Sequence, residues 1–102
     1  MCGIAGHVAT TSVPALAAAD AVRMADPMRP RGPDAAGEWS GEGIVLGHRR
    51  LAILDLDGRA NQPMLSADGR YAIVFNGEIY NFRELRRSLE AAGAVFRTTS
   101  DT

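Results

Sequence analysis

Cys2 carries the most reactive side chain in this sequence, and it is the only cysteine. It directly follows the initiator methionine, which is normally removed when the second residue is small. Removal would leave a thiol and a free α-amine on one residue. Because an α-amine has a pKa of about 7.7–8.0, it can accept the thiol proton near neutral pH. Cys2 could then be a nucleophile with its own general base, although a lone cysteine more often packs as a small apolar residue.

Further polar side chains stand beside glycine in otherwise apolar surroundings. They lie in residues 31–34, 47–51, 76–81 and 100–101. Each stretch alone is a weak signal, because Asn-Gly after a strand is usually a turn and a pair of arginines is usually solvated. Their significance depends on whether the fold brings them to Cys2.

The composition excludes several classes of function. The formal net charge of -1 gives no electrostatic reason to bind nucleic acid or an anionic membrane. The basic residues are all arginine, which removes Schiff-base chemistry and a P-loop lysine. With 1 cysteine and 2 histidines, neither an internal disulfide nor a zinc site is expected, and no other metal site is predicted. No signal peptide or apolar span is visible, so the expected location is cytoplasmic.

The 102 residues are expected to form one domain or part of one. The pattern predicts a helix over 14–26 and a second helix over 82–92, with Asn81 and Glu84 in a capping arrangement and Gly93 as the C-terminal cap. Two helices are too few for crossovers between parallel strands, so we expect mostly antiparallel sheet with the second helix packed on one face. Strands are predicted at 4–9, 36–40, 44–48, 71–75 and 95–99, with 55–64 as loop and a hairpin turn at 41–43.

Five motifs occur together and in order: residues 2–6, 31–34, 48–53, 61–64 and 76–81. On these motifs the whole chain resembles the class II, N-terminal nucleophile type of glutamine amidotransferase domain, as found in glutamine-hydrolysing asparagine synthetases. The resemblance implies an α+β fold, an N-terminal nucleophile hydrolase-like αββα sandwich with antiparallel sheets. The family domain is longer, so residues 1–102 are expected to be the N-terminal half of it, a fragment without a synthetase domain.

The resemblance also implies catalytic roles. Cys2, freed of Met1, would attack the side-chain amide carbon of glutamine, and its α-amine would pass the proton to departing ammonia. The side-chain amide of Asn76 and the backbone N–H of Gly77 would hold the oxyanion. A chain that retains Met1 has a blocked amine and cannot use this mechanism.

Recognition of L-glutamine would need a cation for its carboxylate and anions for its ammonium. The resemblance assigns the first role to Arg50, as a bidentate partner, and the second to Glu78 and Asp101. The loop that contains Asp34 is expected to buttress the site. Arg49 has no such role and is expected to be a solvated arginine.

The function that the resemblance implies is release of ammonia from glutamine for ATP-dependent amidation of aspartate. ATP and Mg²⁺ would act in the absent synthetase domain, and the piece alone is expected to be inactive. A homodimer is left open. Alternatives are a relative that amidates another acceptor, such as a peptide or a cell-surface polysaccharide precursor, and a non-catalytic module that binds glutamine or a partner domain. A third alternative is a small structural protein without a site, which would require all five motifs to occur together by coincidence.

Overall fold

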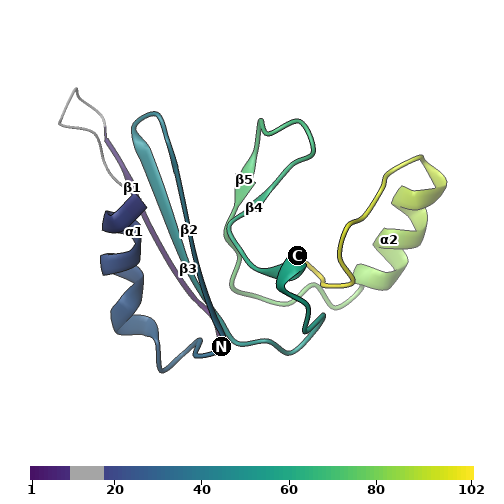
Figure 1. Ribbon diagram of the computed structural model, residues 1–102. Coiled ribbons are helices and arrows are strands. Elements are labelled where there is room, and N and C mark those ends of the chain that lie inside the picture. The colour runs from purple at the N-terminus through teal and green to yellow at the C-terminus, as the bar shows by residue number, and fades with distance from the viewer. Residues whose placement is uncertain (10–17) are drawn as a thin grey trace.

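The computed structural model describes residues 1–9 and 18–102 and shows an α+β fold with antiparallel sheets (Figure 1). The larger sheet has three strands in the order β1-β3-β2. These are β1 (Gly3–Val8), β2 (Ala35–Gly41) and β3 (Ile44–Arg50). The predicted strands at 4–9, 36–40 and 44–48 are confirmed, with bounds that differ by a few residues at most.

The register of this sheet decides what lies next to Cys2. Strand β1 runs antiparallel to β3, and Gly3 is paired with Arg49. The start of the chain therefore lies beside the carboxyl end of β3, where Arg50 stands. On the other side of β3, β2 closes a tight hairpin in which Gly41 pairs with Ile44, as the turn signal at 41–43 predicts.

Helix α1 (Ala18–Ala25) lies across all three strands of this sheet and closes the small core (Figure 1). The approach is close: a Cβ added at Gly47 on β3 would lie 2.7 Å from the backbone oxygen of Ala21. Ala21, Ala25 and Val45 are accordingly almost completely buried. The predicted helix over 14–26 is confirmed for 18–25, and residues 14–17 lie outside the described residues. The short 3-10 helix η1 (Asp26–Met28) follows α1.

A separate hairpin follows β3 along the chain. It consists of β4 (Met64–Leu65) and β5 (Ala72–Ile73), preceded by the 3-10 helix η2 (Gly58–Ala60). The predicted strand at 71–75 is thus shortened to Ala72–Ile73, and it pairs with Met64–Leu65 instead of joining the larger sheet. The stretch 55–64, predicted as loop, contains η2 and the first residue of β4.

Helix α2 (Phe82–Ala91) forms where the sequence predicts it. Gly93 has a φ of 96°, which a residue with a Cβ rarely adopts, and the N–H of Ala94 donates to the oxygen of Leu89 at 2.9 Å. The helix therefore ends with the predicted C-terminal cap. The predicted side-chain cap at Asn81 is wrong, because Asn81 accepts hydrogen bonds through its backbone oxygen and not through its side chain.

The expected packing of α2 on a sheet face is also wrong. Figure 1 shows α2 apart from the three-stranded sheet, and no residue of the helix is buried. Its apolar stripe remains open to solvent, with Leu85 44% and Leu89 48% exposed. Arg86 instead fastens the helix to the segment after it, because its guanidinium donates to Thr98 O at 2.6 Å and lies 4.5 Å from the centre of the Phe96 ring.

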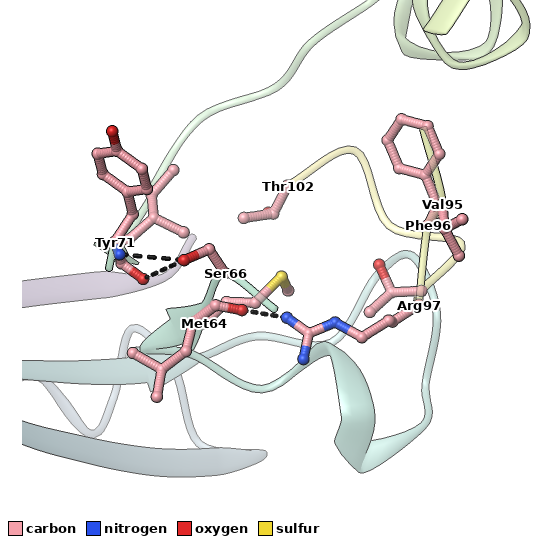
Figure 2. Close-up of a pocket in the computed structure, with 10 residues that line it drawn as sticks. Met64, Ser66, Tyr71, Val95, Phe96, Arg97 and Thr102 are labelled. Atoms are coloured by element: carbon pink, nitrogen blue, oxygen red, sulfur yellow. Dashed lines mark hydrogen bonds between the residues drawn. The ribbon is translucent and has the colours of Figure 1, made fainter. Parts of the chain in front are cut away.

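Residues 95–99 do not form the predicted strand. A strand needs a neighbouring strand for its N–H and C=O groups, and this segment is held by side chains instead. Figure 2 shows Arg97 donating to the backbone oxygen of Leu65 in the β4–β5 hairpin, while Val95 is 90% exposed. A cavity of about 360 Å³ lies between the hairpin and this segment. Neither described helix is long and apolar enough to cross a membrane.

Candidate active site

All the site residues predicted from the sequence line one cavity of about 630 Å³. They are Cys2, Arg50, Asn76, Gly77, Glu78 and Asp101. They come from stretches of chain that are far apart in sequence, so the expected convergence on one cavity is confirmed. Leu51, Ile53 and Leu54 supply apolar wall. The chemical roles of the six residues remain predictions.

The thiol of Cys2 is held at the cavity wall by the backbone of Leu51. The N–H of Leu51 donates to Sγ over 3.3 Å, and the thiol lies 3.7 Å from the oxygen of the same residue. The side chain is half-buried, whereas Met1 is 71% exposed and also lines the cavity. Sheet pairing that begins at Gly3 and the contact with Leu51 together fix the position of the sulfur.

The Arg-Gly-Pro-Asp loop at 31–34 supports this arrangement from behind. Nε of Arg31 donates to the backbone oxygen of Cys2 over 3.4 Å. Asp34 accepts a hydrogen bond from the N–H of Ala52 at 2.8 Å, one residue beyond Leu51. The loop therefore braces both sides of the Cys2–Leu51 contact, which confirms the expectation that it is structural.

The expectation that Arg49 is a solvated arginine is wrong. Its side chain is only 13% exposed and pairs with Asp26 at 3.3 Å. Its Nε is buried without a partner among the described residues. The 31–34 loop also packs closely on this part of β3, because a Cβ at Gly32 would lie 2.4 Å from the backbone of Arg49. The central strand thus carries one arginine on each face, and only Arg50 lines the cavity.

Arg50 is buried and holds the loop that follows β3. Its Nη1 donates to Asp57 O at 3.0 Å and to Asn61 Oδ1 at 2.8 Å. Its Nη2 donates to Leu54 O at 3.0 Å and to Asp55 O. Both terminal nitrogens of Arg50 therefore already donate hydrogen bonds within the protein, which the sequence did not indicate. All four acceptors are uncharged, so the positive charge of Arg50 stays uncompensated by these partners and attracts an anion in the cavity.

The Asn76–Gly77 corner is positioned through Phe75. The N–H of Phe75 donates to Oε1 of Gln62 at 2.5 Å, and the oxygen of Phe75 lies 3.4 Å from Nε2 of His48. Both supporting side chains are buried. In the part of the chain that the structure describes, the side-chain amide of Asn76 has no hydrogen-bond partner, so its N–H donors are available to a ligand.

Asp101 connects the end of the chain to the same corner. Its Oδ2 accepts a hydrogen bond from the N–H of Ile79 at 2.9 Å. Gln62 adds a second link, from its Nε2 to Thr102 Oγ1 at 3.2 Å. Sequence reasoning gave no role to His48, Asp55 or Gln62. Gln62 and His48 stand within recognised motifs, whereas no signal in the sequence marks the contacts of Asp55.

Burial shifts the protonation of His48. Loss of water around the ring lowers its pKa, the charge of Arg50 lowers it further, and the hydrogen bond to Phe75 O opposes both. The neutral ring, with Nε2–H donating to Phe75 O, is therefore the form that fits the folded protein. In the unfolded chain the His48 ring is surrounded by water, so its protonation is not opposed by burial.

Stability is expected to fall as the pH falls below about 6.5, the ordinary pKa of histidine, because the unfolded state then binds a proton that the folded state resists. The contribution of His48 to the slope is at most about 1.4 kcal/mol per pH unit. Chemical denaturation at a series of pH values measures it. His48→Gln should remove this part of the slope, and His7→Gln, at an exposed position of β1, should keep it. Equal slopes in the parent and His48→Gln would contradict the assignment.

The chain can now be placed in a class. The antiparallel α+β fold and the cavity lined by Cys2 agree with a family model for the glutamine amidotransferase domain, which matches residues 1–102. The chain belongs to this family.

The relatives narrow the class further. The chain is 39% identical to asparagine synthetase [glutamine-hydrolyzing] 3 of Bacillus subtilis over 104 residues, which cover 100% of this chain and 17% of that protein. It is 40% identical to a putative asparagine synthetase [glutamine-hydrolyzing] of Mycobacterium tuberculosis over 116 residues, which cover 99% of this chain and 18% of that protein. The chain matches the amidotransferase domain of these proteins and spans less than a fifth of their length.

Proposed function

We propose that this chain is the glutaminase part of a glutamine-hydrolysing asparagine synthase. It releases ammonia from glutamine for ATP-dependent amidation of aspartate. The observation that supports this best is the cavity that Cys2 shares with Asn76, Gly77, Arg50 and Asp101. A nucleophile, neutral donors, a cation and an anion around one space are what hydrolysis of a zwitterionic amide requires.

The chemistry proceeds on Cys2 after removal of Met1. The α-amine takes the thiol proton, and Sγ attacks the amide carbon of glutamine to form a tetrahedral oxyanion. Asn76 Nδ2 and Gly77 N–H donate to this oxyanion. When it collapses, the C–N bond breaks and the protonated amine delivers its proton to the leaving nitrogen. Ammonia departs, and a thioester between Cys2 and the glutamyl group remains. Water, deprotonated by the same amine, then cleaves the thioester to glutamate and restores the thiol.

Recognition of the substrate relies on charge. The glutamine carboxylate faces Arg50, whose guanidinium is surrounded by uncharged oxygens. The ammonium faces Glu78 and Asp101, which line the same cavity. A bidentate contact with the carboxylate requires Arg50 to exchange part of its bonds to the loop after β3 for the ligand.

The remainder of the function lies outside these residues. The three-stranded sheet with α1 on one face supplies part of an N-terminal nucleophile hydrolase αββα sandwich in the cytoplasm. ATP and Mg²⁺ act in a synthetase domain. Among the described residues, no group of three or more His, Cys, Asp or Glu side chains could hold a metal ion.

Asn76→Ala is expected to lower glutamine turnover by about 10²–10³ with little change in glutamine binding, because it removes one oxyanion donor. Ammonia release is assayed in the natural polypeptide that carries residues 1–102. Asn81→Ala is the matched control, since the side chain of Asn81 makes no capping bond.

Equal rates in the two asparagine variants would contradict the proposed oxyanion hole. A parent protein that binds glutamine and releases no ammonia would instead be the non-catalytic binding module. Hydrolysis of glutamine with transfer of ammonia to an acceptor other than aspartate would identify one of the other amidating relatives.

A further inference from the structure

We infer that Asp55 is a positioning residue that sets the spacing between Arg50 and Asp101, and thereby the preference of the site for an α-amino acid. The inference rests on the proposed function, in which those two residues hold the carboxylate and the ammonium of glutamine. Asp55 does not line the cavity itself. It would act only through the residues that it fastens.

The backbone of Asp55 belongs to the Arg50 side of the site. Its carbonyl oxygen accepts a hydrogen bond from Nη2 of Arg50, next to the bond from Nη2 to Leu54 O. The residue has a φ of 46°, in the left-handed region, and it is the one described residue other than glycine with a positive φ. Aspartate and asparagine tolerate this conformation better than most residues. The turn at Asp55 aims two consecutive carbonyl groups at one guanidinium.

The side chain of Asp55 belongs to the Asp101 side. Its Oδ2 accepts a hydrogen bond from the N–H of Thr99 at 2.6 Å, across 44 residues of sequence. Nε of Arg59 lies 3.4 Å from the same oxygen, and the carboxylate is only 4% exposed. The Thr99 N–H holds the pKa of Asp55 below its ordinary value, so the residue is charged at neutral pH and the bond is charge-assisted.

Thr99 stands two residues before Asp101, which in turn accepts the N–H of Ile79. Among the residues that the structure describes, Asp55 and Thr99 are the one hydrogen-bonded pair that joins 51–57 to 98–102. One residue therefore holds Arg50 through its backbone and the Asp101 segment through its side chain. Loss of the carboxylate would remove this link between the two anchors, while Asp101 keeps its bond to the N–H of Ile79 and Cys2 keeps its contact with Leu51.

The test uses two variants and two substrates in the natural polypeptide. Asp55→Gly removes the carboxylate and permits the left-handed backbone, and Asp55→Asn keeps the shape and removes the charge. Asp68→Asn is the control, because Asp68 also accepts a backbone N–H, at 3.1 Å from Arg70, but lies in the β4–β5 turn. The substrates are L-glutamine and glutaramate, which has the carboxylate and the amide but lacks the α-ammonium.

Asp55→Gly is expected to raise the KM for glutamine about tenfold, with kcat changed no more than about threefold. The preference for glutamine over glutaramate in kcat/KM should shrink by about the same tenfold. Asp55→Asn should show a smaller change in the same direction, and Asp68→Asn should show none.

A merely structural role would lower the rates with both substrates equally and leave their ratio unchanged, and that result would overturn the inference. So would failure of both Asp55 variants to fold, because Asp55 would then be needed for folding and not for spacing. Failure of the proposed function is distinguishable from both, since the parent protein would then release no ammonia from glutamine.

Discussion

Replacing Cys2 by alanine is expected to abolish ammonia release from glutamine, with a loss of several orders of magnitude. In the proposed mechanism the sulfur forms the covalent bond to the substrate, and Cys2 is the one thiol among the residues that line the cavity. Removal of a nucleophile removes the covalent route itself, so the effect exceeds the loss of any one hydrogen bond. Ammonia released from glutamine by the natural polypeptide is the quantity to measure.

Free ammonia supplies the internal control for this variant. In the proposed reaction ammonia reaches an activated acceptor without Cys2, so ammonia-dependent product formation should stay close to the parental rate. A parallel loss of both reactions would indicate a folding defect. Retention of the parental glutamine rate by Cys2→Ala would refute the role assigned to the thiol.

Insertion of one alanine between Met1 and Cys2 is expected to lower the glutamine rate by about 10²–10⁴, the usual contribution of a general base. Trimming would then stop at the alanine, and the nitrogen of Cys2 would stay an amide, which cannot accept a proton near neutral pH. The free amine would move away by about one residue, ~3.8 Å. The thiol would keep its contact with Leu51, so binding of glutamine should change little.

Two measurements accompany this insertion. The intact mass shows whether Met1 is removed in each protein, and an alanine inserted in the exposed β4–β5 turn beside Gly69 controls for the added residue. A turn variant that loses activity as far as the N-terminal variant does would mean that insertion alone is harmful. Full activity of the N-terminal insertion variant would mean that another group is the base.

The parts of the fold that sequence predicts well are those fixed by local signals. The hairpin of β2 and β3 follows from two short strand-like segments on either side of the glycine-containing turn at 41–43. Helix α2 follows from its apolar stripe and from Gly93, whose left-handed backbone ends it. The predicted bounds of β1 are nearly right, because this short apolar run pairs along its whole length with the central strand β3.

The parts that sequence predicts poorly depend on contacts between distant segments. Residues 95–99 have an apolar pattern suited to a strand. In place of a strand ladder, Arg86 donates to Thr98 O in this segment, and Arg97 donates to Leu65 O in the β4–β5 hairpin. The side chain of Arg49 is only 13% exposed and pairs with Asp26, 23 residues away in the sequence. Neither set of contacts produces a periodic pattern in the sequence from which it could be predicted.

The candidate site divides in the same way. Its residues could be chosen from the sequence because several motifs of one family occur in order, and the fold brings them to one cavity. The contacts that hold these residues in place could not be predicted from the sequence. Engagement of the Arg50 donors by the loop after β3 and the bridge from Asp55 to Thr99 both depend on tertiary structure.

The most direct test of the central claim is to locate the covalent adduct of a reactive glutamine analogue. An analogue with a diazoketone in place of the amide, incubated with the natural polypeptide, should attach one equivalent to the peptide that begins at Cys2 and lacks Met1. Peptide mass mapping identifies the residue, and excess L-glutamine should slow the labelling. An adduct on any other residue, or labelling of Cys2 that glutamine does not slow, would contradict the assignment of Cys2 as the N-terminal nucleophile.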